Sequence, residues 1–380
     1  MQTKLPDEKR TSLPSFEGQK AWALALTKMA EVNKNAYRNN STLHHYQSTE
    51  VEIAKTEHDV VLQIDKMRLL RYRALTSRNL SIPPVIICYG LVGRYSIIDI
   101  HHDRSLVRNL LQAGIDVFVI DWGTPTRIDQ YLDFDDYIGD YLRACIEHVY
   151  RLNNDQPATL FGICEGGTMA AMQAALQPNL LAGLALAITP IDFHGAPKEF
   201  RLGEGFINIW AQNLEAEDIE LLLETYGMLP GAFIGNIFSS LTHVSGLSKL
   251  SLDLKNLNND PEATMDFLRM EKWIADRPDH AGAAARQLIN QLYRENQLIK
   301  GLFEVQGEKI DLSRITCPVI NIYAKQDHII PNSCTTALGK FINPERYHEL
   351  GIDGGHVGIF VSKKAQGIVA DGLIGWMNSI

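Results

Sequence analysis

Short apolar runs alternate with longer mixed segments along most of this 380-residue chain. An apolar run of about four to eight residues bounded by turn residues is typical of a strand buried on both faces of a sheet. Such runs predict strands at 84–90, 116–121, 158–161, 184–190 and 318–324. The mixed segments between them predict helices at 103–113, 134–152 and 168–176. Strands that alternate with helices in this way predict a mostly parallel sheet covered on both faces.

The alternation stops between residues 193 and 301, where helical segments dominate. An insertion of helices at this point predicts a cap over the sheet. We therefore divide the chain into an N-terminal helical segment (1–55), a core (56–192 and 302–380) and a helical cap insertion (193–301). Aromatic residues of the cap either pack its own core or line a tunnel beneath it; they are Trp210, Phe233, Phe238, Phe267, Trp273 and Tyr293.

Two further elements are predicted before the first buried strand. Segments 60–64 and 67–73 indicate a hairpin. Trp22, Leu26 and Met29 lie at helical spacing within 16–38, which predicts an amphipathic helix. Its apolar face either packs on the domain or docks a partner subunit.

The composition argues against some classes of function and indicates the cellular compartment. The net charge of −9 argues against a general nucleic-acid role, which needs a basic surface. Five cysteines without regular spacing indicate a reducing compartment, and no spacing of His or Cys indicates a metal site. The start of the chain has no apolar core of a secretory signal, and the longest apolar stretch, 180–188, is far short of the ~20 residues that span a bilayer. We therefore expect a cytoplasmic protein without a membrane span.

A sharp strand-to-helix turn is predicted around Cys164. Residues 162–167 read G-I-C-E-G-G, between the strand at 158–161 and the helix at 168–176. The pattern G-x-nucleophile-x-G at such a turn marks the nucleophile elbow of α/β-hydrolase folds, where larger side chains would collide with neighbouring elements. A helix N-terminus behind the sulfur favours the thiolate. We interpret Cys164 as a nucleophile rather than as an incidental buried cysteine.

An acid and a base follow Cys164 in the order that this fold uses. Asp327 lies in a polar loop after the strand at 318–324, and His356 lies in a Gly-rich loop further on. Nucleophile, acid and base in this order are typical of α/β-hydrolases. His356 is the expected proton acceptor from the Cys164 thiol. Asp327 either orients His356 or assists the attack of a second substrate.

Seven segments, taken together and in order, resemble the catalytic subunit of polyhydroxyalkanoate synthases. The similarity is to the short type that works with a second subunit, class III, with class IV as the alternative. One departure is Glu165, where this family usually has Gln or a neutral residue; a carboxylate beside the sulfur is expected to oppose the thiolate. The matching segments are 121–123 (DWG), 162–167, 188–193 (ITPIDF), 267–273 (FLRMEKW), 321–324 (NIYA), 327–328 (DH) and 354–362 (GGHVGIFVS).

The resemblance implies an α/β-hydrolase fold, a mostly parallel central sheet with an inserted helical cap, and an acyltransferase activity. Such an enzyme polymerises 3-hydroxyacyl-CoA, mainly 3-hydroxybutyryl-CoA, into polyester and releases CoA through a covalent acyl-Cys164. The backbone N–H groups of Val92 and Glu165 are the implied donors of the oxyanion hole. No cofactor is implied, because CoA is a product.

The resemblance also implies partners and a location. These are the 3-hydroxyacyl-CoA substrate, the growing polyester chain, and a second synthase subunit that is PhaE-like or PhaR-like. A homodimer of the catalytic chain at the surface of polyester granules is also implied.

Two other functions compete with this interpretation. One is a Cys-dependent α/β-hydrolase that acts on esters, lactones or thioesters; the long cap and the matched segments outside the triad argue against it. The other is a non-catalytic binding or granule-coat protein, which the intact set of Cys164, Asp327 and His356 argues against.

Overall fold

The structure, a computed structural model, describes residues 50–79, 81–195, 205–235 and 260–380. The chain divides into two compact units. One consists of Met1–Val51 and Thr242–Met265, of which residues 50–51 and 260–265 are described. The other consists of Glu52–Leu241 and Asp266–Ile380 and contains the sheet. The helix predicted at 16–38 and Phe238 lie outside the described residues, and the boundaries at 55, 192 and 301 stay predictions.

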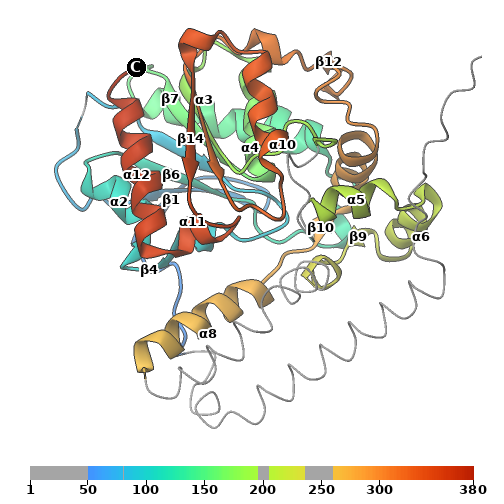
Figure 1. Cartoon of the computed structure of the whole chain (residues 1–380), viewed down its shortest axis with the longest axis horizontal. Coiled ribbons are helices and arrows are strands. Elements are labelled where there is room, and N and C mark those ends of the chain that lie inside the picture. The colour runs from blue at the N-terminus through green and yellow to red at the C-terminus, as the bar shows by residue number, and fades with distance from the viewer. Residues whose placement is uncertain (1–49, 80, 196–204, 236–259) are drawn as a thin grey trace, which may run out of the picture. The chain divides into compact units, whose positions relative to one another are not determined.

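An eight-stranded sheet forms the centre of the second unit (Figure 1). Strand β2 pairs antiparallel with both β1 and β6, whereas all other neighbours in the sheet are parallel. The hairpin, the mostly parallel sheet and all five predicted buried strands are therefore confirmed. In sheet order the strands are β1 (His58–Ile64), β2 (Met67–Tyr72), β6 (Val117–Asp121), β3 (Val85–Cys88), β7 (Ala158–Ile163), β8 (Leu181–Ala187), β13 (Val319–Ala324) and β14 (Tyr347–Ile352).

Helices cover both faces of the sheet because successive strand residues point to opposite sides. In β3, Val85 and Ile87 pack into one apolar cluster, whereas Ile86 and Cys88 pack into the other. The first cluster includes α2 and α12, which lie side by side (Figure 1), and the second includes α3 and α4. These helices are α2 (Leu106–Gln112), α3 (Arg143–Leu152), α4 (Glu165–Leu176) and α12 (Lys363–Met377).

Two of the predicted helices differ in detail from the observed ones. Helix α2 begins later than residue 103 because Arg104–Ser105 pairs as strand β5 with β4 (Asp99–His101), and the Ser105 side chain then caps the helix by accepting from Arg108 N. The segment 134–152 begins as a π-helix, η4 (Asp135–Leu142), and continues as α3.

The described part of the cap insertion is mostly helical, as predicted. Its strands β9 and β10 pair antiparallel, a feature too short to leave a periodic pattern in the sequence. The elements of this region are α5 (Phe206–Gln212), α6 (Ala216–Tyr226), β9 (Met228–Leu229), α8 (Pro261–Ala275), β10 (His280–Ala281), α9 (Gly282–Arg286) and η5 (Gln287–Arg294).

The remaining elements are short connections of the core. Among the described residues, no helix combines the length and the apolarity that crossing a membrane requires. The connecting elements are η2 (Tyr95–Ile98), η3 (Arg127–Asp129), β11 (Glu304–Val305), β12 (Glu308–Lys309), η6 (Leu312–Arg314), α10 (Asn332–Thr336), η7 (Ala337–Lys340), η8 (Pro344–Arg346) and α11 (Gly358–Val361).

The turn between β7 and α4 has the strained backbone of a nucleophile elbow. Cys164 has φ 54° and ψ −127°, a conformation that residues with a side chain rarely adopt. A Cβ on Gly166 would lie 2.2 Å from Cys88 O, and one on Gly167 would lie 1.9 Å from Thr189 Oγ1. Glycine is therefore required here by the close approach of β3 and of the segment that follows β8.

We expect Gly166→Ala to lower the free energy of unfolding by at least about 2 kcal/mol, because the new methyl group must displace the backbone after β3. Urea unfolding measures the change. Gly367→Ala is the control, since its Cβ would meet nothing within 4 Å on α12 and should add about 1 kcal/mol of helix stability. Equal stability of Gly166→Ala and wild type would mean that the elbow is not packed as described.

Candidate active site

The structure brings the three predicted catalytic residues to one edge of the sheet. Cys164 lies between β7 and α4, Asp327 follows β13, and His356 follows β14. The carboxyl ends of parallel strands share one edge, which explains why these separate segments meet. His356 Nδ1 lies 2.7 Å from Asp327 Oδ2, and His356 and Cys164 line the same cavity. This arrangement can remove a proton from the thiol.

Asp327 is held on every side. Its Oδ1 accepts hydrogen bonds from the backbone N–H groups of Ile329 and Ile330, each at 2.9 Å, and its Oδ2 faces His356. Its side chain is only 1% exposed. Both carboxylate oxygens are thus engaged, and the ring of His356 is fixed in orientation.

The charge state of His356 depends on its two neighbours. Burial of the imidazole acts to lower its pKa, but the Asp327 carboxylate and the Cys164 sulfur outweigh burial and raise the pKa to about 10. The positive form of His356 is therefore stabilised between a carboxylate and the thiol sulfur.

The structure contains a contact that the sequence did not indicate, between the Val92 backbone N–H and the Glu165 side chain. Glu165 Oε2 accepts hydrogen bonds from the backbone N–H groups of Leu91, at 2.8 Å, and Val92, at 3.2 Å. Its Oε1 lies 3.0 Å from Nε2 of His280, a fully buried residue of the cap strand β10. The Val92 N–H is thus directed at the Glu165 carboxylate, and this carboxylate is paired rather than isolated beside the sulfur.

An apolar cavity of about 80 Å³ opens above Cys164. Trp273 and Tyr293 of the cap line it, together with Cys164 and His356. A second apolar cavity of about 70 Å³ shares the wall residues Val92, Ile207, Leu288 and Tyr293 with the first. Trp210 and Phe233 line this second cavity. Four of the six cap aromatics therefore lie on the walls of these two spaces.

Comparison with known proteins identifies the family. Residues 83–363 match the model of the alpha/beta hydrolase fold. The chain is 37% identical over 320 residues to the poly(3-hydroxyalkanoate) polymerase subunit PhaC of Thiocystis violacea, which covers 84% of this chain and 87% of that protein. The chain belongs to the poly(3-hydroxyalkanoate) polymerase family. The PhaC of Allochromatium vinosum is 38% identical, and the match covers 83% of this chain and 86% of that protein. The PhaC of Synechocystis is 34% identical, and the match covers 87% of this chain and 86% of that protein.

Membership of the polymerase family confirms the α/β-hydrolase fold and the resemblance drawn from the sequence motifs. The roles of Cys164, Asp327, His356, Val92 and Glu165 stay predictions, now with the geometry described above. All five cysteines of the chain are free thiols, and Cys164 is the one that is not buried.

Two residues of the site were missed by the sequence analysis. Arg277 lines the first cavity with its guanidinium 5.6 Å from the ring centroid of Trp273, and burial lowers its pKa. His280 reaches Glu165 from β10. Both follow Trp273 in an irregular segment of the cap, where no periodic pattern or motif indicates which side chains face the sulfur.

The raised pKa of His356 predicts a pH dependence of stability. Its folded-state pKa of about 10 lies above the ~6.5 of an unfolded histidine, so the folded state binds the proton more tightly. This contribution is complete below about pH 6.5 and is lost as the pH rises towards 10. We expect the free energy of unfolding of wild type to fall over this window by on the order of 3 kcal/mol more than that of His356→Gln. Urea unfolding at several pH values measures the difference; parallel curves for the two proteins would contradict the prediction.

Proposed function

We propose that the chain polymerises 3-hydroxyacyl-CoA, mainly 3-hydroxybutyryl-CoA, through an acyl-Cys164 intermediate. The observation that carries this proposal is the Cys164–His356–Asp327 arrangement in a member of the polymerase family. His356 takes the thiol proton, and the thiolate attacks the thioester carbonyl of the substrate. The C–S bond to CoA then breaks, His356 returns the proton to the CoA sulfur, and the acyl group remains on Cys164. No cofactor is needed, because CoA is a product.

A cysteine suits this reaction for an energetic reason. Exchange of one thioester for another is nearly isoenergetic, so the acyl group stays activated for attack by a hydroxyl. The 3-hydroxyl of a second hydroxyacyl-CoA then attacks the acyl-Cys164 carbonyl, loses its proton to His356, and forms the ester bond of the polymer. The C–S bond to Cys164 breaks, His356 returns the proton to the Cys164 sulfur, and the lengthened chain, still a CoA thioester, can acylate Cys164 again.

The oxyanion of each step is assigned to the backbone N–H groups of Val92 and Glu165. Donors aimed at such an oxyanion contribute roughly 3–4 kcal/mol each in mutational data. What supports Val92 is its place on the cavity wall, in the loop that follows β3. Its N–H bond to Glu165, at 3.2 Å, is the longer of the two that this carboxylate accepts from the loop.

Asp327 is assigned the orienting role. Both of its oxygens are engaged by His356 and by two backbone N–H groups, so neither is directed at a substrate hydroxyl. Asp327→Asn should therefore fail at acylation of Cys164. Rapid-quench detection of a normally formed acyl-enzyme that then stalls would instead assign Asp327 to chain transfer.

The two neighbouring apolar cavities, which share wall residues, are assigned to the acyl group and the start of the chain. Their walls are aromatic and aliphatic side chains of the cap and core, which favour an aliphatic polyester over a charged ligand. The competing function is hydrolysis of an ester, lactone or thioester, which the fold also supports. The products separate the two: free CoA with insoluble polymer, or free CoA with a soluble acid.

Cys164→Ala should lower CoA release from 3-hydroxybutyryl-CoA at least a thousandfold and abolish polymer formation, because the acyl acceptor is lost. Thiol titration of released CoA and sedimentation of polymer measure the two products. Cys145→Ala, a buried cysteine of α3, is the matched control and should keep its activity. Activity of Cys164→Ala above a tenth of wild type would assign the nucleophile to another residue.

We further propose that the chain is the catalytic chain of a short, two-subunit synthase of class III, with class IV as the alternative. The support is length: the chain spans 86–87% of its Thiocystis, Allochromatium and Synechocystis relatives, but 45% of the polymerase of Methylorubrum extorquens. The second subunit is PhaE-like or PhaR-like, the catalytic chain forms a homodimer, and the assembly works at the surface of polyester granules.

The isolated chain should show a long lag in CoA release. The partner subunit should remove the lag and raise the rate at least tenfold, equivalent to about 1.4 kcal/mol of barrier. The physical reason is that a cap over the thiol excludes water but also restricts substrate entry, so a partner with higher affinity for an open form shifts the population. CoA release with and without the subunit encoded beside this chain tests the idea. Lag-free, full activity of the isolated chain would refute it.

A further inference from the structure

A second buried acid–histidine pair lies beside the sulfur, and the mechanism above leaves it unused. Glu165 directly follows Cys164, and its Oε1 lies 3.0 Å from His280 Nε2. The Glu165 side chain is 8% exposed and that of His280 is 0% exposed. Burial of an ionisable pair is costly unless its hydrogen bonds are satisfied.

The other oxygen of Glu165 holds the loop after β3. This loop, residues 89–94, is called the oxyanion loop below. Glu165 Oε2 accepts from Leu91 N at 2.8 Å and from Val92 N at 3.2 Å. Tyr89, Gly90, Val92 and Gly93 of the loop line the cavity together with Cys164. The distance between the loop backbone and the sulfur therefore depends on where the Glu165 carboxylate is held.

His280 holds that carboxylate from the cap. Strand β10 places it by pairing His280 with Leu229 of β9. Its Nδ1 lies 3.2 Å from Ala281 O and its Nε2 faces Glu165, so both ring nitrogens face oxygen acceptors. A proton on Nε2 lets the ring donate to the Glu165 carboxylate and hold it from the cap side.

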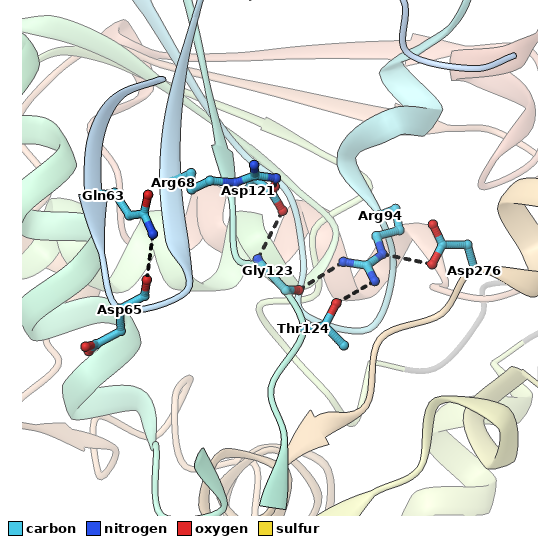
Figure 2. A network of polar contacts seen from close by, with 8 residues as sticks. All are labelled: Gln63, Asp65, Arg68, Arg94, Asp121, Gly123, Thr124 and Asp276. Atoms are coloured by element: carbon cyan, nitrogen blue, oxygen red, sulfur yellow. Dashed lines mark hydrogen bonds and ion pairs between the residues drawn. The ribbon is translucent and has the colours of Figure 1, made fainter. Parts of the chain in front are cut away.

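The same cap segment also holds the far end of the oxyanion loop (Figure 2). Trp273 Nε1 donates to Arg94 O at 2.9 Å. Arg94 Nε donates to Asp276 Oδ1 at 3.2 Å, while its other nitrogens donate to Gly123 O and Thr124 Oγ1. Cap residues 273–280 thus hold the loop at two points, an inner one at Glu165 and an outer one at Arg94.

We propose that Glu165 and His280 are positioning residues that hold the oxyanion loop against Cys164, so that stabilisation of the oxyanion depends on the position of the cap. The shorter bond, from the Leu91 N–H, keeps the loop attached to Glu165. The longer bond, from the Val92 N–H, is the one that breaks when this N–H donates to the oxyanion instead. This inference rests on the acyl-Cys164 mechanism proposed above.

The contact within the pair predicts an order among variants. Without the His280 imidazole, the buried Glu165 carboxylate loses its donor from the cap, next to the position where the negative oxyanion develops. His280→Gln should therefore slow acylation more than Glu165→Gln does. In the double variant two neutral amides share a hydrogen bond, and the amide carbonyl that replaces the carboxylate still accepts from Leu91, so acylation should recover.

The test compares two reactions of the same sulfur in wild type, both single variants and the double variant. Acylation by 3-hydroxybutyryl-CoA, followed by rapid quench and intact-protein mass, passes through an oxyanion. Alkylation by iodoacetamide does not. We expect His280→Gln to slow acylation at least tenfold and alkylation less than about threefold, and the double variant to acylate within about threefold of wild type.

Two further variants serve as controls. His148→Gln in α3 and Glu220→Gln, which faces Arg286 on the cap, make the same chemical changes away from the loop and should acylate normally. A third variant, Asp276→Asn, tests the outer contact: it removes the charge that faces Arg94 at an exposed position, which makes it the variant least prone to misfolding. It should slow acylation about threefold and leave alkylation unchanged.

The outcomes separate this inference from the mechanism on which it rests. Equal losses of acylation and alkylation in His280→Gln, or losses that simply add in the double variant, overturn the positioning role. So does normal acylation in His280→Gln and Asp276→Asn. Normal acylation in wild type together with any of these results leaves the covalent mechanism standing, whereas a wild type that forms no acyl-Cys164 overturns both.

Discussion

The close approach of three backbone segments at the elbow is the constraint on which the site depends. Gly166 lies against the end of β3, and Gly167 lies against Thr189 beyond β8. Between these contacts, Cys164 adopts a conformation with positive φ. This contact sets the spacing between the sulfur and the loop that follows β3. Any side chain at these glycines would move the nucleophile away from the groups that serve it.

Two buried carboxylates flank the sulfur and are held in the same way. Asp327 accepts from two successive backbone N–H groups and faces His356. Glu165 accepts from two successive backbone N–H groups and faces His280. A buried carboxylate is stable only when such donors replace its lost water. The Asp327–His356 pair lies within the core, whereas the Glu165–His280 pair joins the elbow to the cap.

The proposed role of the Glu165–His280 pair gives the cap a part in polyester synthesis beyond covering the site. Cap aromatics form walls of the cavities above Cys164, and the cap segment 273–280 contacts the loop beside it. An enzyme that keeps an activated acyl group must exclude water and yet admit thioester and hydroxyl in turn. On the positioning role proposed for Glu165 and His280, stabilisation of the oxyanion depends on the position of the cap.

The sequence by itself determined the sheet, the elbow and the triad candidates. Mostly apolar runs such as 116–121 and 318–324 indicate buried strands, and the glycines around Cys164 specify the turn. The triad candidates followed from the order of Cys164, Asp327 and His356 along the chain, whereas strand β14, which positions His356, was not among the predicted strands. The meeting of Glu165 with His280 was decided by tertiary structure alone. These residues are 115 positions apart in the sequence. Two-residue strands such as β9 and β10 leave no periodic pattern that would predict where His280 lies. Only the folded cap brings the His280 imidazole to the buried Glu165 carboxylate.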